Sequence, residues 1–259
     1  IILYPQDFWG KQQTSRLKIM CGRFTSTASP EELMRHFGVT ILENLQPRWN
    51  VAPAQNSLVI HQTGLHIEAK QAKWGLPPAS SKQSFLINAR METVAEKPTF
   101  REAFAVSRAL IPATGWYEWS APKQPWHIQL RDGGPMAMAG LLFERPTHPQ
   151  THFVIITSPA EGALQSIHHR QPLIVPKQSW QDWLTGSTSI AQQILISAPA
   201  SLFNWYRVAA DVGKVAHDHP GLVTPLNEEA LAAEEARAAE EAASKPTDRS
   251  TGLQGNLFS

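Results

Sequence analysis

The chain has 259 residues, of which 42% are hydrophobic and 17% are charged, so it is able to bury a substantial core. Its 23 basic and 22 acidic residues give a formal net charge of +1. The single cysteine excludes a disulfide framework and a cysteine-based zinc cluster, and no apolar run is long enough for a membrane helix.

Residues 1–19 are predicted to be an appendage to the folded protein. They show neither helical nor strand periodicity, and they lack the apolar core of a signal peptide. Three explanations remain open: a reading frame extended upstream of a true start at Met20, a propeptide that is later removed, or an extension added for expression. We expect these residues to be absent from the mature protein.

Folded elements are predicted from Ser29 onward. The stretch SPEELMRHFG predicts a helix with Ser29 as N-cap, Pro30 in the first turn and Gly38 as the stop. A hairpin is expected around Thr63-Gly64. Further strand-like runs cover 126–132, 136–144 and 152–158, and EGALQSI and PKQSWQDWL are predicted to be helical. Strands outnumber helices and the connections are short, so we predict an α+β fold with a mostly antiparallel, curved sheet and short helices.

The composition changes after Leu226. An Ala/Glu-rich helix is predicted over 228–243, followed by a polar tail that is expected to be disordered. Residues 222–259 carry seven acidic and three basic groups, whereas 20–221 have a net charge of +3, which is compatible with a nucleic-acid groove. We therefore predict an extension (1–19), a catalytic domain (20–224), and a helix with a flexible tail (225–259).

The single cysteine directly follows the first methionine of the chain. If Met20 is removed, Cys21 presents a free α-amine and a thiol on adjacent carbons. With an aldehyde, the amine forms a Schiff base and the thiol closes a five-membered thiazolidine, which an internal cysteine is unable to do. Cationic neighbours such as Arg23 are expected to lower the pKa of the thiol. The alternative is an apolar cysteine buried in the core.

Six ordered stretches combine this cysteine with other polar residues. They are CGRF (21–24), RWNVAP (48–53), WGLPP (74–78), INARMET (87–93), GWYEW (115–119) and IHHRQP (167–172). Together they closely resemble the SRAP family, the SOS response-associated peptidases or abasic-site-processing proteins, over roughly Cys21 to Thr224.

The resemblance implies four catalytic residues. Members of the family crosslink an N-terminal cysteine to the ring-opened aldehyde of an abasic site in single-stranded DNA, and Cys21 matches that nucleophile. Glu118 matches the acid/base that helps to open the sugar and to reverse the crosslink. His168 matches the histidine that contacts the sugar, and Asn88 matches the asparagine that positions the cysteine and the lesion. No metal and no cofactor are implied.

The resemblance also implies a DNA-binding set, in which the arginines grip phosphates: Arg23, Asn50, Trp74, Arg90, Trp119, Thr157 and Arg170. Two departures from the family pattern stand out. His169 takes the place of a frequent acid, which is expected to alter the local pH response. The stretch 77–85 lacks a tryptophan that the family commonly has after WGL-P, so the grip on DNA beside the lesion is expected to differ.

Each residue also has a plainer interpretation. Taken singly, Glu118 reads as an exposed strand residue, His168 as a surface imidazole and Arg170 as a solvated charge. We expect at least two of Trp74, Trp116 and Trp119 to belong to the core.

The tail contains a further candidate motif. QGNLF resembles the short peptides by which bacterial proteins dock on the replicative sliding clamp, with Gln254, Leu257 and Phe258 as anchors. The alternative is a chance match.

Three functions are compared. The leading hypothesis is an abasic-site sensor that crosslinks to single-stranded DNA, acts as a monomer in the cytoplasm near the nucleoid, and has a lyase-like activity in reversing the crosslink. The second is a cysteine peptidase, most credibly one that processes itself before Cys21. The third is a reader that binds single-stranded or modified DNA without a covalent bond.

Overall fold

The computed structural model describes residues 21–41, 44–78, 85–145 and 148–243. The chain divides after Thr224 into two compact units. The expected helix over 228–243 is present in the second unit as α5 (Glu228–Ala243), and the clamp motif at 254–258 lies outside the described residues. Among the described residues, no helix has the length and apolar character needed to cross a bilayer.

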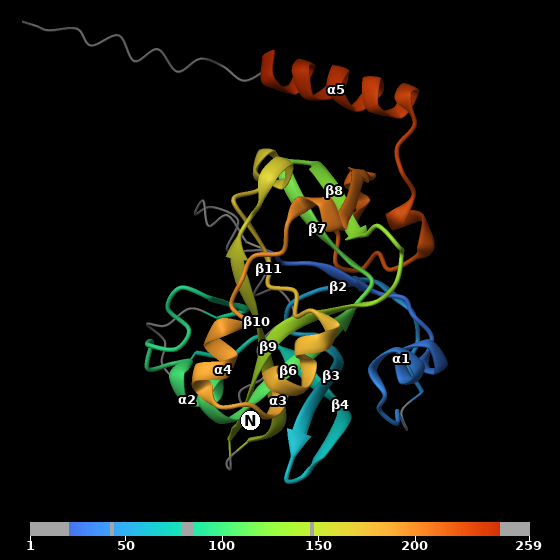
Figure 1. Cartoon of the computed structure of the whole chain (residues 1–259). Helices are drawn as coiled ribbons and strands as arrows, with labels where there is room; N and C mark the ends of the chain where they lie inside the picture. Colours follow the sequence, from blue (N-terminus) through green and yellow to red (C-terminus); the bar gives the residue numbers. More distant parts are fainter. Residues whose placement is uncertain (1–20, 42–43, 79–84, 146–147, 244–259) are drawn as a thin grey trace, which may run out of the picture. The chain divides into compact units, whose positions relative to one another are not determined.

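The first unit contains a five-stranded sheet in the order β12-β8-β7-β1-β2, and all its pairings are antiparallel. Its strands are β1 (Phe24–Ser26), β2 (Arg48–Val51), β7 (Gly115–Ala121), β8 (Gln124–Leu130) and β12 (Phe203–Arg207). Strand β7 lies inside this sheet, between β8 and β1 (Figure 1), so its backbone is paired on both sides.

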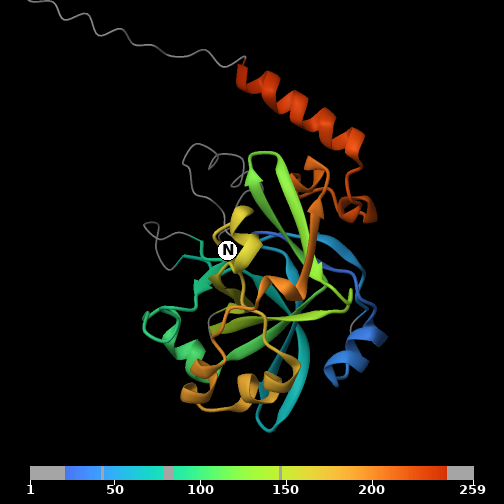
Figure 2. The same cartoon turned by 45° about the horizontal axis from the view of Figure 1, so that its top comes forward.

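A seven-stranded sheet follows the order β11-β10-β4-β3-β6-β9, with β5 also paired to β10. Strand β10 pairs with both β4 and β9, so five strands close into a ring, which gives the sheet its curvature (Figure 2). The pairings of β10 with β4 and β5 are parallel and the others are antiparallel, which confirms the predicted mostly antiparallel sheet. The strands are β3 (Asn56–Thr63), β4 (His66–Trp74), β5 (Asn88–Arg90), β6 (Arg108–Ala113), β9 (Met136–Arg145), β10 (His148–Pro159) and β11 (Arg170–Pro172).

The helices are short and their ends follow local signals. In α1 (Pro30–Phe37), the Ser29 side chain accepts a hydrogen bond from the Glu32 N–H, and Gly38 ends the helix at φ +70°, as predicted. The hairpin at Thr63-Gly64 is also confirmed. EGALQSI forms a 3-10 helix (Gly162–Ser166), and PKQSWQDWL forms a 3-10 turn followed by α3. The remaining helices are α2 (Arg101–Val106), α3 (Trp180–Thr185) and α4 (Thr188–Gln193).

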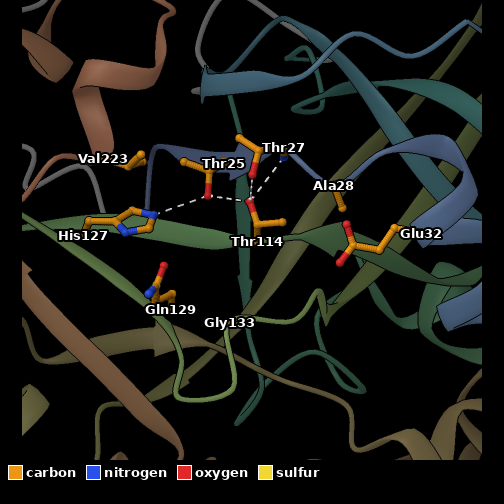
Figure 3. Close-up of a pocket in the computed structure, with 9 residues that line it drawn as sticks. All are labelled: Thr25, Thr27, Ala28, Glu32, Thr114, His127, Gln129, Gly133 and Val223. Atoms are coloured by element: carbon orange, nitrogen blue, oxygen red, sulfur yellow. Dashed lines mark hydrogen bonds between the residues drawn. The ribbon is translucent and has the colours of Figure 1, made fainter.

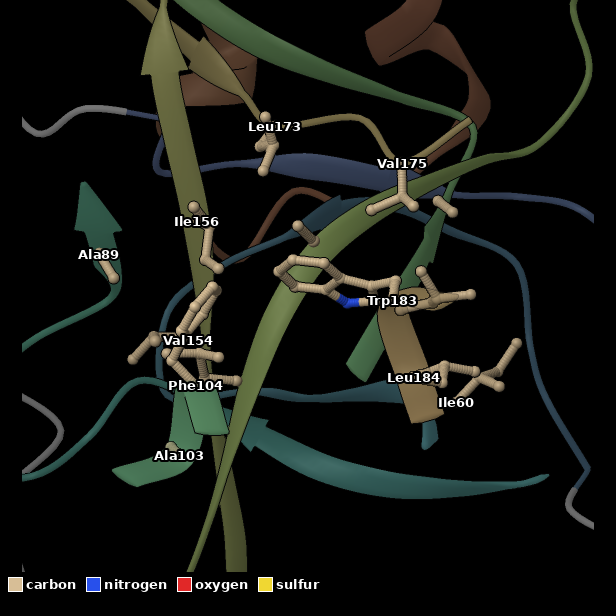
Figure 4. Packing of buried hydrophobic residues seen from close by; sticks show 14 of the residues in the cluster. Ile60, Ala89, Ala103, Phe104, Val154, Ile156, Leu173, Val175, Trp183 and Leu184 are labelled. Atoms are coloured by element: carbon tan, nitrogen blue, oxygen red, sulfur yellow. The ribbon is translucent and has the colours of Figure 1, made fainter. Parts of the chain in front are cut away.

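The helices pack on the seven-stranded sheet through a cluster around Trp183 (Figure 4). Phe104 from α2 and Val154 from β10 lie to one side of this indole, and Val175 lies above it. The Trp183 Nε1–H donates to the carbonyl of Ala109 at 2.9 Å, which satisfies its polar atom inside the core.

A second apolar cluster joins the two sheets. Phe24 and Trp116 contribute from the five-stranded sheet, and Trp74 and Phe153 from the seven-stranded sheet. Trp74 and Trp116 are fully buried, which confirms that at least two of the three tryptophans belong to the core. This cluster holds the start of β1, and therefore Cys21, next to β7 and β10.

Candidate active site

Cys21 and Glu118 meet because β1 pairs with β7. Phe24 lies opposite Trp116, and the Tyr117 N–H donates to the Arg23 carbonyl at 3.0 Å. The backbone nitrogen of Cys21 then lies 2.9 Å from Oε1 of Glu118 and donates to it. Cys21 is 3% exposed and Glu118 is 2% exposed, so this hydrogen bond is shielded from water.

Burial controls the electrostatics of Glu118. The loss of solvation raises the pKa of this carboxyl to about 8, and the hydrogen bonds from Cys21 lower it without offsetting that effect. The carboxyl is therefore mainly protonated at neutral pH and able to donate a proton to a bound reactant. The interpretation of Glu118 as an exposed strand residue is wrong, because its strand lies inside the sheet and this face meets the core.

The Cys21 thiol is held in its neutral form. Burial raises its pKa well above the ordinary value, the charge of Glu118 raises it further, and the Arg170 guanidinium lowers it. The expectation that Arg23 lowers the thiol pKa is therefore wrong, since the cation that acts on the thiol is Arg170. Arg23 and Pro172 lie around Cys21, and Sγ approaches the Arg170 carbonyl at 3.9 Å.

His168 faces the same carboxylate. Its Nδ1 lies 3.7 Å from Oε2 of Glu118, and 3.1 Å and 3.2 Å from the carbonyl oxygen and the nitrogen of Arg170. His168 is 8% exposed, so it is not a surface imidazole. The ring of His169 packs against it with the centroids 4.3 Å apart, so any charge on one imidazole is felt by the other.

Arg170 is the buried centre of a polar network. Its Nη1 and Nη2 donate to the two carboxylate oxygens of Glu92, and Nη2 also donates to the carbonyl and the hydroxyl of Thr157. With 7% exposure it is not a solvated charge. Glu92 is a member of this network that the sequence pattern did not indicate, although it lies in the INARMET motif two residues after Arg90.

Strand β5 brings the last expected catalytic residue to this neighbourhood. Asn88 pairs with Ile155 and Arg90 with Thr157, in parallel register on β10. Asn88 is half-buried and Arg90 is exposed. Because Arg170 binds Thr157, the β5 segment and the His168 segment are joined through β10 beside Cys21 and Glu118.

This geometry coincides with a family match. A family model described as SOS response associated peptidase (SRAP) matches residues 20–215. The chain belongs to the SRAP family. It is 31% identical over 223 residues to the abasic site processing protein YedK of Escherichia coli, covering 80% of this chain and 100% of that protein. It is 32% identical to the abasic site processing protein YoaM of Bacillus subtilis, covering 80% and 99%.

Solved structures agree with the expected SRAP-like α+β fold. A Bacteroides thetaiotaomicron protein superposes with a TM-score of 0.69 at 23% identity, over 80% of this chain and 100% of that chain. A phage-related protein from Bordetella bronchiseptica gives a TM-score of 0.64 at 28% identity, over 73% and 94%.

Three residues of the expected DNA-binding set are structural in this SRAP domain. Trp74 and Asn50 are fully buried, and the Trp74 indole donates to the Ile87 carbonyl at 2.9 Å. Thr157 is also fully buried, and it donates to Ala89 and binds Arg170. In this structure the three side chains face the interior, and their contact with DNA stays a prediction. Their hydrogen bonds hold Ile87, Ala89 and the 212–217 loop in place.

The other candidates keep accessible surface. Arg23 is half-buried and its Nη2 donates to the Gly213 carbonyl at 3.4 Å, whereas Arg90 is exposed. Trp119 is half-buried and packs beside Tyr117, on the face of β7 that points away from Glu118. Most of the stretch that lacks the family tryptophan, 79–84, lies outside the described residues.

Asn50 is expected to be needed for folding. Its amide nitrogen donates to the carbonyls of Val212, Lys214 and His217 at 3.2, 3.1 and 2.7 Å. Asn50→Ala leaves these carbonyls without that donor, so we expect a loss of about 2–3 kcal/mol in the free energy of unfolding. Urea denaturation measures it, and Asn204→Ala, at an exposed position, is the control. Equal midpoints for the two variants would contradict this role.

A separate polar pocket of about 160 Å³ is lined by Thr25 and His127 among others (Figure 3). It lies on the face of the five-stranded sheet that points away from Glu118, because His127 is paired with Tyr117. The Thr114 hydroxyl is hydrogen-bonded to the hydroxyls of Thr27 and Thr25 at 2.9 and 3.0 Å, and the His127 imidazole lies 3.4 Å from the Thr25 hydroxyl. Burial lowers the pKa of His127 to about 4, so its imidazole is neutral at neutral pH. Neither Cys21 nor Glu118 lines this pocket.

Proposed function

We propose that this protein processes abasic sites in single-stranded DNA by forming a covalent thiazolidine between Cys21 and the ring-opened sugar. The α-amine of Cys21 condenses with the aldehyde and releases one water molecule. The Cys21 thiol then gives its proton up through Glu118 as its sulfur adds to the imine carbon, and the same proton is delivered to the ring nitrogen. The reaction requires no oxidant, and Glu118 supplies or accepts the proton at each step.

The position of the Cys21 nitrogen carries this proposal. In the reacting form this nitrogen is the α-amine, 2.9 Å from the Glu118 carboxylate. An ordinary α-amine has a pKa of about 7.7–8.0. With Met20 in place, burial raises the pKa of the Glu118 carboxyl toward this range, and the hydrogen-bond distance allows a proton to pass directly between the two groups. The SRAP relatives named abasic site processing proteins support the choice of substrate.

The test is an intact-mass measurement followed by a crosslinking assay. We expect a protein whose mass begins at Cys21 to gain one abasic single-stranded oligonucleotide, in an adduct that resists SDS. Cys21→Ala should form no such adduct. If the protein beginning at Cys21 forms no adduct, the proposal fails. If Cys21→Ala binds the lesion as tightly as the parent and neither forms an adduct, the protein is a non-covalent reader.

Self-processing before Cys21 is a second candidate activity. Cys21 has φ of +40°, in the left-handed region that strains a residue with a side chain. In this step the Cys21 thiol adds to the Met20 carbonyl carbon and passes its proton to Glu118, and the Cys21 nitrogen leaves with a proton from the same carboxyl, which lies 2.9 Å away. Water then hydrolyses the resulting thioester, which releases residues 1–20 with a free carboxyl group and restores the thiol. Cys21→Ser should therefore keep residues 1–20. A Cys21→Ser protein that loses them in a purified preparation would argue against autoproteolysis.

The sliding clamp is proposed as a partner through Gln254, Leu257 and Phe258, which would keep the protein near replicating DNA in the cytoplasm. We expect a synthetic peptide of the tail to bind purified clamp, and a peptide with Leu257→Ala and Phe258→Ala to lose at least tenfold in affinity, about 1.4 kcal/mol. Equal binding of the two peptides would end this proposal.

A further inference from the structure

One cluster of metal-ligating side chains lies outside the SRAP motifs. The ligand atoms of Asp211, His217 and His219 lie within 4.8 Å of one another, on the segment between β12 and the end of the first unit. Two imidazoles and one carboxylate are a donor set that suits zinc and related divalent ions.

The spacing between the first two ligands matches a tetrahedral ion. Nδ1 of His217 lies 3.3 Å from Oδ2 of Asp211. Two atoms that each lie 2.0–2.1 Å from zinc, at a tetrahedral angle, are about 3.3 Å apart. This Nδ1 is buried and makes no hydrogen bond of good geometry within the described residues. An ion between the two atoms would replace their direct contact and be coordinated by both.

The other oxygen of the carboxylate is already engaged. Nζ of Lys214 lies 3.1 Å from Oδ1 of Asp211, so the carboxylate presents Oδ2 alone toward His217. A second partner of this kind fixes the orientation of a carboxylate ligand. Lys214 is 67% exposed in its side chain, which leaves it free to move away from an incoming cation.

The backbone that carries the ligands is rigidly held. Asn50 binds the carbonyls of Val212, Lys214 and His217, as described above. The Asp218 carboxylate accepts the N–H groups of Trp49 and Asn50 at 2.6 and 3.1 Å, and it pairs with Arg48. The loop is therefore fixed on β2 at several points between the first and last ligands, which lowers the entropy cost of binding an ion.

The third proposed ligand, His219, lies on the solvent-exposed side of the cluster. His219 is exposed, and its imidazole lies against Gly221, where an added Cβ would come within 3.1 Å of Nδ1. The glycine thus gives the ring room to lie against the loop. Its side chain is exposed, so in the proposed complex it would turn toward the other two ligands, whose ligand atoms lie within 4.8 Å of its own.

We propose that Asp211, His217 and His219 bind one zinc-type divalent ion, with the fourth position open to water or to an oxygen ligand. The ion would hold the loop whose Gly213 carbonyl accepts from Arg23, one of the residues around Cys21. The site is independent of the thiazolidine chemistry, because it shares no residue with that reaction.

The experiment is a zinc titration by calorimetry on the full chain, purified without a polyhistidine tag and treated with a chelator. The background is Cys21→Ser, so that the single thiol is unable to bind the metal. We expect one saturable site per chain. His219→Ala and His217→Ala should each lower the affinity by more than tenfold, and His66→Ala, at an exposed histidine in the β3–β4 hairpin, should leave it unchanged.

A second pair of measurements distinguishes loss of a metal ligand from misfolding of the variant. Cobalt(II) should give the visible absorption of a four-coordinate site in the parent protein and lose it in His219→Ala, whose side chain is exposed and dispensable for folding. Zinc should also raise the melting temperature of the parent and not of this variant. Weak binding at several sites that is equal in the parent and in both variants would show adventitious surface binding and overturn the proposal.

Discussion

Glu118→Gln is expected to slow adduct formation at neutral pH by about 100-fold or more, because general acid–base groups contribute about 10²–10⁴-fold. Glutamine keeps an oxygen that accepts from the Cys21 nitrogen, and the carboxyl is buried against that nitrogen at 2.9 Å. The variant therefore preserves the hydrogen bond and removes the proton. Single-turnover crosslinking to an abasic oligonucleotide, with the protein beginning at Cys21, measures the rate.

The same substitution should change how stability depends on pH. The folded pKa of about 8 lies above the ordinary value of 4.5, so the folded protein holds a proton that the unfolded chain releases. The stability from this group is fully present below pH 4.5 and is lost as the pH rises to about 8. The loss is on the order of 4 kcal/mol for the form in which Cys21 follows Met20, and Glu118→Gln should remove it.

Glu96→Gln provides the control, since Glu96 is an exposed carboxylate of the same domain. Its pH profiles should match those of the parent. An unchanged crosslinking rate in Glu118→Gln, with a normal melting temperature, would contradict the assignment of proton transfer to this residue. A difference between the stability curves of the parent and Glu118→Gln that stays constant between pH 5 and pH 8 would contradict the raised pKa.

Elements with local signals were predictable from the sequence. The α1 helix was located within a residue at each end, because Ser29, Pro30 and Gly38 specify its ends through their own backbone and side-chain preferences. The β3–β4 hairpin follows from its turn in the same way. The ring closed by β10 was not predictable, since the parallel pairings with β4 and β5 join segments far apart in sequence.

The residues that form the candidate site were predictable from the sequence, but their burial and hydrogen bonds were less so. Motif matching identified Glu118 and His168, which the structure brings to 3.7 Å, but taken singly each read as a surface group. Their burial depends on β7 being an inner strand, which is a tertiary property. The same matching assigned Asn50 to DNA and did not indicate that it fixes the 212–217 loop, because a residue that fixes a loop and a residue that binds a ligand leave similar motifs. Glu92 was missed because an acid two residues from Arg90 has no distinctive spacing.

The second large effect is expected for Arg170→Ala. Arg170 is 7% exposed and donates to Glu92 and to the carbonyl of Thr157, so its removal leaves a buried carbonyl without its charged donor. We expect a loss of about 3 kcal/mol in the free energy of unfolding. Glu92 is 42% exposed in its side chain and is solvated once it is freed, which keeps the loss below that of a fully buried ion pair.

Arg170→Ala should also raise the pKa of the Cys21 thiol and slow its reaction at neutral pH. Arg170 is the cation that lowers the thiol pKa against burial and the charge of Glu118, so the variant should hold the thiol still more firmly in its neutral form. Crosslinking should then be slower at pH 7 and recover as the pH rises.

Arg170→Lys separates the two effects, because lysine keeps the charge and loses the planar fork that spans Glu92 and Thr157. It should recover more of the crosslinking rate than of the stability. Arg90→Ala, at an exposed position on β5, should leave the stability unchanged. If Arg170→Ala slowed crosslinking by the same factor at pH 7 and pH 9, Arg170 would act by holding the site together and not through the thiol.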